Sequence, residues 1–123
     1  MTWVWLAVAG GLGAVARYRV DLLVPRGGGA PRGTVVVNMS ACLLLGLVTG
    51  ASTLLSSTVV TVLGAGLLGG YSTFSTASVE GARLVLEGRW GSEAAHAAGM
   101  TLGTVVCAWL GVTIGTVLVA ARV

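Results

Sequence analysis

The chain has 123 residues, of which 55% are hydrophobic and 9% charged, and its mean hydropathy is +0.95. Because a soluble domain carries about 25% charged residues, this composition excludes a water-soluble globule and predicts a membrane protein. The net charge of +3 does not indicate nucleic-acid binding, because the arginines that supply it are spread over the ends of predicted helices. Cys42 and Cys107 lie in apolar segments and are interpreted as packing residues, not as a disulfide or a metal pair.

A helix needs about 20 apolar residues to cross the hydrocarbon core, and four segments meet this requirement. The first covers about residues 3–23, carries two arginines and an aspartate in its last third, and is followed by the loop VPRGGGAPRG. The second covers about 33–54 and is uncharged beyond its start. The third covers about 59–85 after a short turn, and the fourth covers about 94–121 after the loop LEGRWGSE. The sequence therefore predicts one four-helix transmembrane domain over residues 1–123.

Four crossings place both termini on one side of the membrane, and the arginines are unequally divided between the two sides. Arg122 lies toward the side of the termini. Six arginines lie toward the other side: Arg17, Arg19, Arg26, Arg32, Arg83 and Arg89. Because arginine-rich loops stay inside the cell, both termini are predicted to face outward. Arg17 either extends to the lipid headgroups or belongs to an electropositive vestibule that gathers anions.

Glycine is abundant, with 20 residues, and several glycines are spaced four apart. These pairs are Gly46 and Gly50, Gly66 and Gly70, Gly99 and Gly103, and Gly111 and Gly115. In lipid, small residues at this spacing let helix backbones approach closely. Four helices with such faces have more of them than one small bundle can bury, which predicts an oligomer.

The third predicted helix contains the stretch GLLGGYSTFSTASVE, residues 66–80, where two glycines precede a run of hydroxyl side chains. Glycine costs about 1 kcal/mol per helical position relative to alanine, so the stretch predicts a break in the helix. A broken helix at membrane depth is tolerated where it is buried in protein or lines a wet cavity. Its carbonyls can then hold a cation while its hydroxyls face an ion. The alternative is a kink that serves only packing.

Three further residues could contact an ion near such a break. Asn38, in the second helix, either forms an interhelical hydrogen bond or turns its amide donors toward a pore. Phe74, the only phenylalanine, either fills the core or turns the positive edge of its ring toward an anion. Thr104 could continue a track of hydroxyls, although threonine in membrane helices often bonds to carbonyls of its own helix. His96 is interpreted as interfacial, because no second metal ligand has suitable spacing.

Three stretches together resemble the signature blocks of the Fluc/CrcB fluoride channel family: GGLGAVARY (10–18), GTVVVNMSAC (33–42) and GGYSTFSTASVEG (69–81). The sequence EGRWG before the fourth helix fits as well, so the resemblance covers nearly the whole chain in order and spacing. It implies an all-α membrane protein in which two four-helix subunits, each with a break in helix 3, form an antiparallel dual-topology dimer. It also implies two fluoride pores, no enzymatic activity and a multi-pass location in a prokaryotic plasma membrane.

The resemblance assigns roles to individual residues. It implies a structural sodium ion at the dimer centre, held by the main-chain carbonyls of Gly69 and Ser72, where threonine is usual at the second position. The residues that it implies in the fluoride pore are Asn38, Phe74, Ser75, Thr76 and Thr104. Arg17 corresponds to an arginine of the vestibule.

Besides Ser72, the chain departs from the family pattern at three positions. The family has a box with two phenylalanines; the first corresponds to Phe74, and Ala77 stands in place of the second. His96 stands where tyrosine or asparagine is usual, and Met100 replaces a polar residue. The implied function is passive fluoride export that relieves toxicity, with fluoride, membrane lipid and a second copy or a paralogous subunit as partners. One alternative, which Ala77 leaves open, is a subunit that only completes a partner's pore. The other is a proton-coupled multidrug exporter, which needs a carboxylate inside helix 1, where the chain has only Asp21 near the end.

Overall fold

The computed structural model describes residues 1–24 and 32–122, which form helices joined by short turns. Three helices are continuous: α1 (Thr2–Leu23), α2 (Arg32–Gly50) and α6 (Trp90–Ala120). A 3₁₀ turn, η1 (Ser52–Leu54), follows α2. The third long stretch is divided into α3 (Ser57–Thr61), the π-helical η2 (Val62–Leu68), α4 (Gly69–Tyr71) and α5 (Phe74–Leu86).

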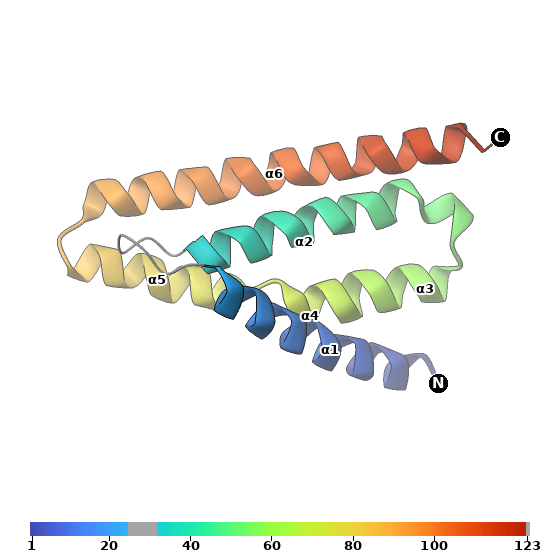
Figure 1. Cartoon of the computed structure of the whole chain (residues 1–123), viewed down its shortest axis with the longest axis horizontal. Helices are drawn as coiled ribbons and strands as arrows, with labels where there is room; N and C mark the ends of the chain where they lie inside the picture. Colours follow the sequence, from blue (N-terminus) through green and yellow to red (C-terminus); the bar gives the residue numbers. More distant parts are fainter. Residues whose placement is uncertain (25–31, 123) are drawn as a thin grey trace.

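The helices form an up-and-down bundle in which both termini lie at the same end (Figure 1). α2 packs along α6, and α1 packs along η2 and α4. The hairpin of α5 and the first turns of α6 extends beyond α1 and α2 at the end opposite the termini (Figure 1). The interruption between α4 and α5 therefore lies near the middle of the bundle, where α1 ends and α2 begins.

The turn between α5 and α6 is tighter than the sequence predicts, so α6 begins at Trp90 and not near residue 94. Gly88 has φ +72°, a conformation that side chains rarely adopt. The Gly88 N–H donates to the Val85 carbonyl at 2.9 Å, and the Arg89 N–H donates to the Leu84 carbonyl at 2.8 Å. This pair of hydrogen bonds around a left-handed glycine ends a helix abruptly. The second helix also ends earlier than predicted, at Gly50.

Three helical stretches of the described chain are long and apolar enough to cross a membrane: Arg32–Gly50, Ser57–Leu86 and Trp90–Ala120. α1 has 22 residues, which is also a sufficient length. However, two arginines and Asp21 reduce the hydropathy of its last third. That α1 crosses the membrane as a fourth span therefore stays a prediction.

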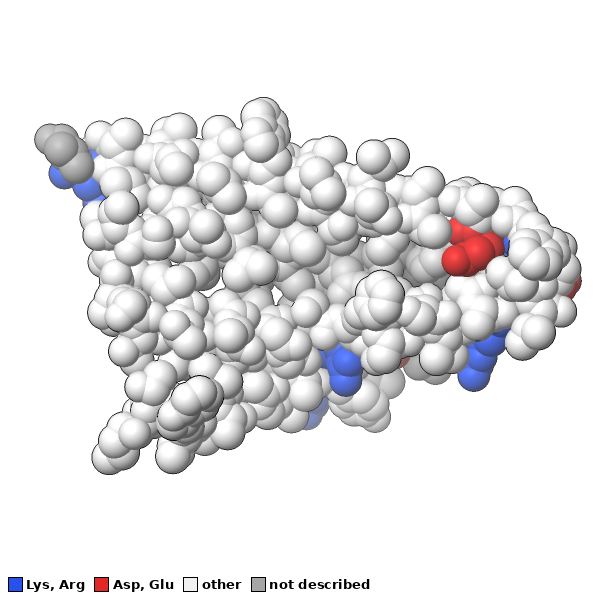
Figure 2. Space-filling view, turned by 180° about the vertical axis from the view of Figure 1, so that it is seen from behind, with Lys and Arg blue, Asp and Glu red and all other residues white. Residues whose placement is uncertain are grey.

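Many large apolar side chains of the chain are exposed. Among residues 1–24 and 32–122, Val37 is the only large side chain that is fully buried, with 1% exposure. Figure 2 shows a mostly uncharged face, with charged side chains near the α5–α6 turn, at the opposite end and along one edge. Such a surface is unfavourable in water and suits contact with lipid or with another subunit. Of the arginines counted above, Arg26 lies outside the described residues.

Glycines bring the backbones of α2 and α6 into direct contact. A Cβ atom on Gly46 would lie 3.0 Å from the Cα of Gly111, and one on Gly50 would lie 3.1 Å from the Cα of Gly115. The predicted close approach at glycines spaced four apart is confirmed for these pairs. By contrast, a Cβ on Gly99 would have no neighbouring atom within 4 Å. The small-residue ridge of α6 is thus only partly used within the subunit.

Candidate functional site

The third long helix is interrupted at two hydroxyl residues. Ser72 has ψ 161°, and Thr73 has φ −151° and ψ 115°, so both are extended between α4 and α5. The predicted break is confirmed. The two preceding glycines remain helical, and Gly70 serves packing, because a Cβ there would collide with the backbone of Gly10 in α1. The break therefore follows the glycines and does not coincide with them.

Asn38 in α2 bonds twice to the backbone of Thr73. Its Nδ2 donates to the Thr73 carbonyl at 2.9 Å, and its Oδ1 accepts from the Thr73 N–H at 2.8 Å. A buried peptide group without a partner costs about 1–3 kcal/mol, so this amide compensates for the missing helical hydrogen bonds. The interhelical hydrogen bond is thus one role of Asn38. Its second Nδ2 hydrogen is not used by this pair of bonds.

The same hydrogen bonds release two main-chain carbonyls. In an uninterrupted helix the Thr73 N–H would donate to the Gly69 carbonyl, and the Thr76 N–H would donate to the Ser72 carbonyl. Here the Thr73 N–H donates to Asn38, and the Thr76 N–H donates to the Thr73 Oγ1 at 3.2 Å. The carbonyls of Gly69 and Ser72 therefore lose their ordinary helical donors. Both belong to the segment for which the sequence predicts a cation site.

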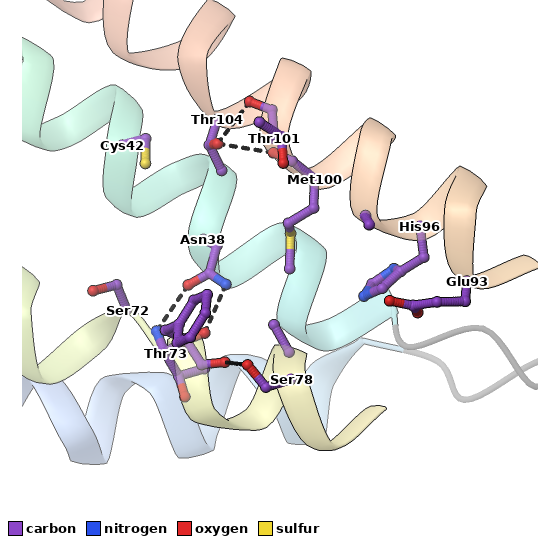
Figure 3. Close-up of a pocket in the computed structure, with 13 residues that line it drawn as sticks. Asn38, Cys42, Ser72, Thr73, Ser78, Glu93, His96, Met100, Thr101 and Thr104 are labelled. Atoms are coloured by element: carbon purple, nitrogen blue, oxygen red, sulfur yellow. Dashed lines mark hydrogen bonds between the residues drawn. The ribbon is translucent and has the colours of Figure 1, made fainter. Parts of the chain in front are cut away.

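A cavity of about 510 Å³ opens between α2, the break, α5 and α6 (Figure 3). Asn38 lies on one wall of it, and Thr104 lies on α6 across from the break (Figure 3). Of the residues singled out from the sequence, those that line this cavity are Asn38, Ser72, Phe74, Ala77, His96, Met100 and Thr104. The break therefore adjoins a cavity. A kink that served only packing would not need one.

The aromatic and hydroxyl candidates in this cavity differ in how far the subunit covers them. Phe74 is 86% exposed although it lines the cavity, so the subunit alone leaves most of its ring uncovered. The Thr104 hydroxyl donates within α6, toward the carbonyls of Met100 at 2.8 Å and Thr101 at 3.0 Å. Its oxygen can still accept, but its proton is already shared between these carbonyls.

A second cavity, of about 230 Å³, lies between α1, α2 and α5. Two predicted residues line it, Arg17 and Thr76. Thr73 lines both cavities, so they adjoin one another at the break. Ser75 lines neither cavity, and its Oγ lies 3.4 Å from the Thr73 Oγ1. Of the predicted pore residues, Asn38, Phe74 and Thr104 therefore line the larger cavity, Thr76 lines the second, and Ser75 lies outside both.

Two polar residues of the second cavity, Thr34 and Glu80, are not among the predicted site residues. The hydroxyl of Thr34, which is buried, donates to the Glu80 Oε1 at 2.7 Å. Thr34 stands four residues before Asn38, which places both on one face of a helix. Glu80 is the only carboxylate between residues 57 and 86. These two signals were present in the sequence, but the pairing of Thr34 with Glu80 depends on how α2 packs against α5.

The three departures from the family pattern share one location. Ala77, His96 and Met100 all line the larger cavity together with Asn38. Three departures from the family pattern that are separate in the sequence therefore lie in one cavity of the structure. Any effect of these changes on an ion would be exerted in this cavity.

Comparisons with known proteins agree with this architecture. Residues 4–112 match the family model described as CrcB-like protein, Camphor Resistance (CrcB). A protein of Cutibacterium acnes named fluoride-specific ion channel FluC 2 is 42% identical, with 94% of this chain and 98% of the relative covered. A protein of Symbiobacterium thermophilum named fluoride-specific ion channel FluC 1 is 40% identical over the same shares. One of Acidobacterium capsulatum, named fluoride-specific ion channel FluC, is 34% identical over 98% of this chain and its own full length, 100%.

The family match spans both the interrupted helix and the segment that carries Asn38, and the relatives align over nearly their whole length. The multidrug-exporter alternative has no support from these matches. The chain belongs to the CrcB-like family of membrane proteins.

Proposed function

We propose that the protein is a subunit of a fluoride-selective channel that lets fluoride leave a prokaryotic cell passively across the plasma membrane. The observation that carries this proposal is the helix break held by Asn38 between two cavities to which polar side chains contribute. The relatives named as fluoride-specific ion channels support the choice of ion. The function involves no chemical step.

Fluoride is small and strongly hydrated, so a selective pore must replace the hydrogen bonds of water at short range. The Thr73 hydroxyl donates to the Thr76 Oγ1 at 2.9 Å, which leaves the Thr76 proton available to an ion. The unused Nδ2 hydrogen of Asn38 and the ring edge of Phe74 are further donors without full charge. Donors of this strength let an ion enter and leave. Arg17 in the second cavity supplies a positive charge that gathers anions.

We further propose that the channel is an antiparallel dimer, formed with a second copy or with a paralogous subunit. The exposed ring of Phe74 and the open small-residue faces at Gly11 and Gly99, where a Cβ would meet no atom within 4 Å, support a partner. The uneven arginines support a fixed orientation of this subunit, with its termini outside. That orientation fits a heterodimer better than a chain inserted both ways.

A structural sodium ion at the dimer centre completes the proposal. The carbonyls of Gly69 and Ser72 have lost their helical donors, and main-chain carbonyls at a helix break suit Na⁺. Gly69 is exposed on the subunit surface, where carbonyls of a second subunit could join it. The residues present therefore fit the ion, whose positive charge would balance the carbonyl oxygens around it.

Fluoride efflux from liposomes tests the function. Purified dimer, reconstituted alone or with a paralogous subunit, is expected to release trapped fluoride, measured with a fluoride electrode, and to retain chloride. Donors placed at short range suit a small anion, and a larger anion cannot approach all of them as closely. Equal release of both anions, or no release from any dimer, would contradict the proposal.

Ala77→Phe separates a pore-lining subunit from one that only completes a partner's pore. If this chain lines a pore, restoring the second ring in the cavity is expected to raise fluoride flux up to about tenfold, because an aromatic contact contributes about 0.5–1.5 kcal/mol. Unchanged flux would favour the partner-completing role. Val79→Phe is the matched control, since Val79 lies on α5, is 54% exposed and does not line the cavity.

A further inference from the structure

One end of the larger cavity contains a group of ionisable side chains that the proposed pore does not use. His96 and Glu93 of α6 line this end, and Figure 3 shows both away from Asn38, near the start of α6. Glu80 of α5 lies within electrostatic reach of His96. His96 is the only histidine of the chain, and it stands where the family usually has an uncharged side chain.

Each of these three side chains has a buried polar atom without a hydrogen-bond partner among the described residues. The atoms are the Nε2 of His96, the Oε2 of Glu93 and the Oε2 of Glu80. The Glu93 carboxylate packs against α5, with its oxygens 2.6 and 2.8 Å from where a Cβ of Gly81 would lie. Unpaired buried polar groups are unfavourable. Protonation of His96 would place a positive charge beside the carboxylates and would thereby stabilise the cluster.

The charges around His96 are predominantly negative. The ionisable groups near it or near its neighbour Glu80 are, by helix, Asp21 of α1, Cys42 of α2, Glu80 and Arg83 of α5, and Glu93 of α6. With a neutral imidazole, the Glu93 carboxylate at this end of the cavity and the Glu80 carboxylate within electrostatic reach of His96 disfavour an anion. An imidazolium reduces this excess, and both of its nitrogens are donors.

Building on the proposed fluoride channel, we propose that His96 is a proton-binding site whose protonation admits fluoride to this end of the cavity, so that conduction rises as the pH falls. Histidine changes charge between about pH 5 and pH 8. The position of His96 near the start of α6 places it toward one membrane surface. α6 has 31 residues, or about 46 Å at 1.5 Å per residue, which exceeds a hydrocarbon core of about 30 Å. Its hairpin with α5 extends beyond α1 and α2 (Figure 1).

The test is the fluoride current of the reconstituted dimer in planar bilayers, at equal pH on both sides, from about pH 5 to pH 8. Current is the readout because neutral hydrogen fluoride carries none. We expect a current about tenfold higher at the acid end, as charge repulsion near a protein surface is relieved. His96→Gln is expected to hold the current at the low level throughout, and Glu93→Gln is expected to raise it at the alkaline end.

Glu87→Gln is the matched control. Glu87 is an exposed carboxylate of the same hairpin, 3.6 Å from Arg89, and does not line the cavity, so its removal is expected to leave the profile unchanged. A flat profile in the conducting wild type, or a pH dependence that survives His96→Gln, would overturn the proposal.

A dimer that carries no current at any pH would contradict the channel function itself, and NMR then tests the proton site alone. Resonances of the single imidazole are expected to shift across the same pH range. Resonances that do not change with pH would exclude a proton-binding His96.

Discussion

Replacement of Asn38 by alanine is expected to reduce fluoride current by about a hundredfold or more. The variant leaves both the N–H and the carbonyl of Thr73 without their partners, which lie at 2.8 and 2.9 Å in the native protein. Each unpaired group costs about 1–3 kcal/mol, and every 1.4 kcal/mol is about tenfold in an equilibrium. The break would then close, or rearrange, and both adjoining cavities would change shape.

Current in planar bilayers and thermal unfolding in detergent measure this effect together. Asn38→Asp keeps an acceptor for the Thr73 N–H but places a second oxygen against the Thr73 carbonyl, so an intermediate loss is expected. Thr49→Ala is the control on the same helix, because the Thr49 hydroxyl bonds only to the Leu45 carbonyl of α2, at 2.8 Å. Native current and native unfolding temperature in Asn38→Ala would show that the break does not depend on this amide.

Gly111→Leu is expected to separate α2 from α6 and to destabilise the subunit by about 3 kcal/mol or more, because overpacking of a close contact forces the backbone apart. A Cβ on Gly111 would collide with the carbonyl oxygen of Leu43 and would lie 2.9 Å from the Leu47 nitrogen. Both atoms belong to the α2 backbone, which cannot move aside as a flexible side chain can. Asn38 lies on the same helix and would be displaced from the break.

The measurement is the unfolding midpoint in mixed detergent micelles, followed by helical circular dichroism. Gly91→Leu is the control on α6, because a Cβ at Gly91 has no neighbour within 4 Å and leucine is the better helix former. It is expected to unfold at the wild-type midpoint or slightly above it. If Gly111→Leu behaves in the same way, the contact between α2 and α6 is not as close as described.

Composition and local pattern were sufficient to predict the helical membrane architecture. A helix forms its backbone hydrogen bonds within four residues along the chain. Low charge, long apolar segments and glycine spacing are therefore visible in short stretches of sequence. The break in the third helix was also predictable, since GGYST combines weak helix formers with hydroxyls that can cap a new helix. Thr73 does so for α5 through the Thr76 N–H.

The tertiary structure decided how the site is assembled. Asn38 and Thr73 are 35 residues apart, and Thr34 and Glu80 are 46 apart, so neither pair can be identified before α2 is docked against α5. The packing of α2 against α6 likewise depends on whether glycines such as Gly46 face another backbone, which a sequence pattern does not specify. The same packing places Ala77, His96 and Met100 in one cavity. The sequence alone therefore determined the helices and the interruption, while long-range packing decided which polar groups meet there.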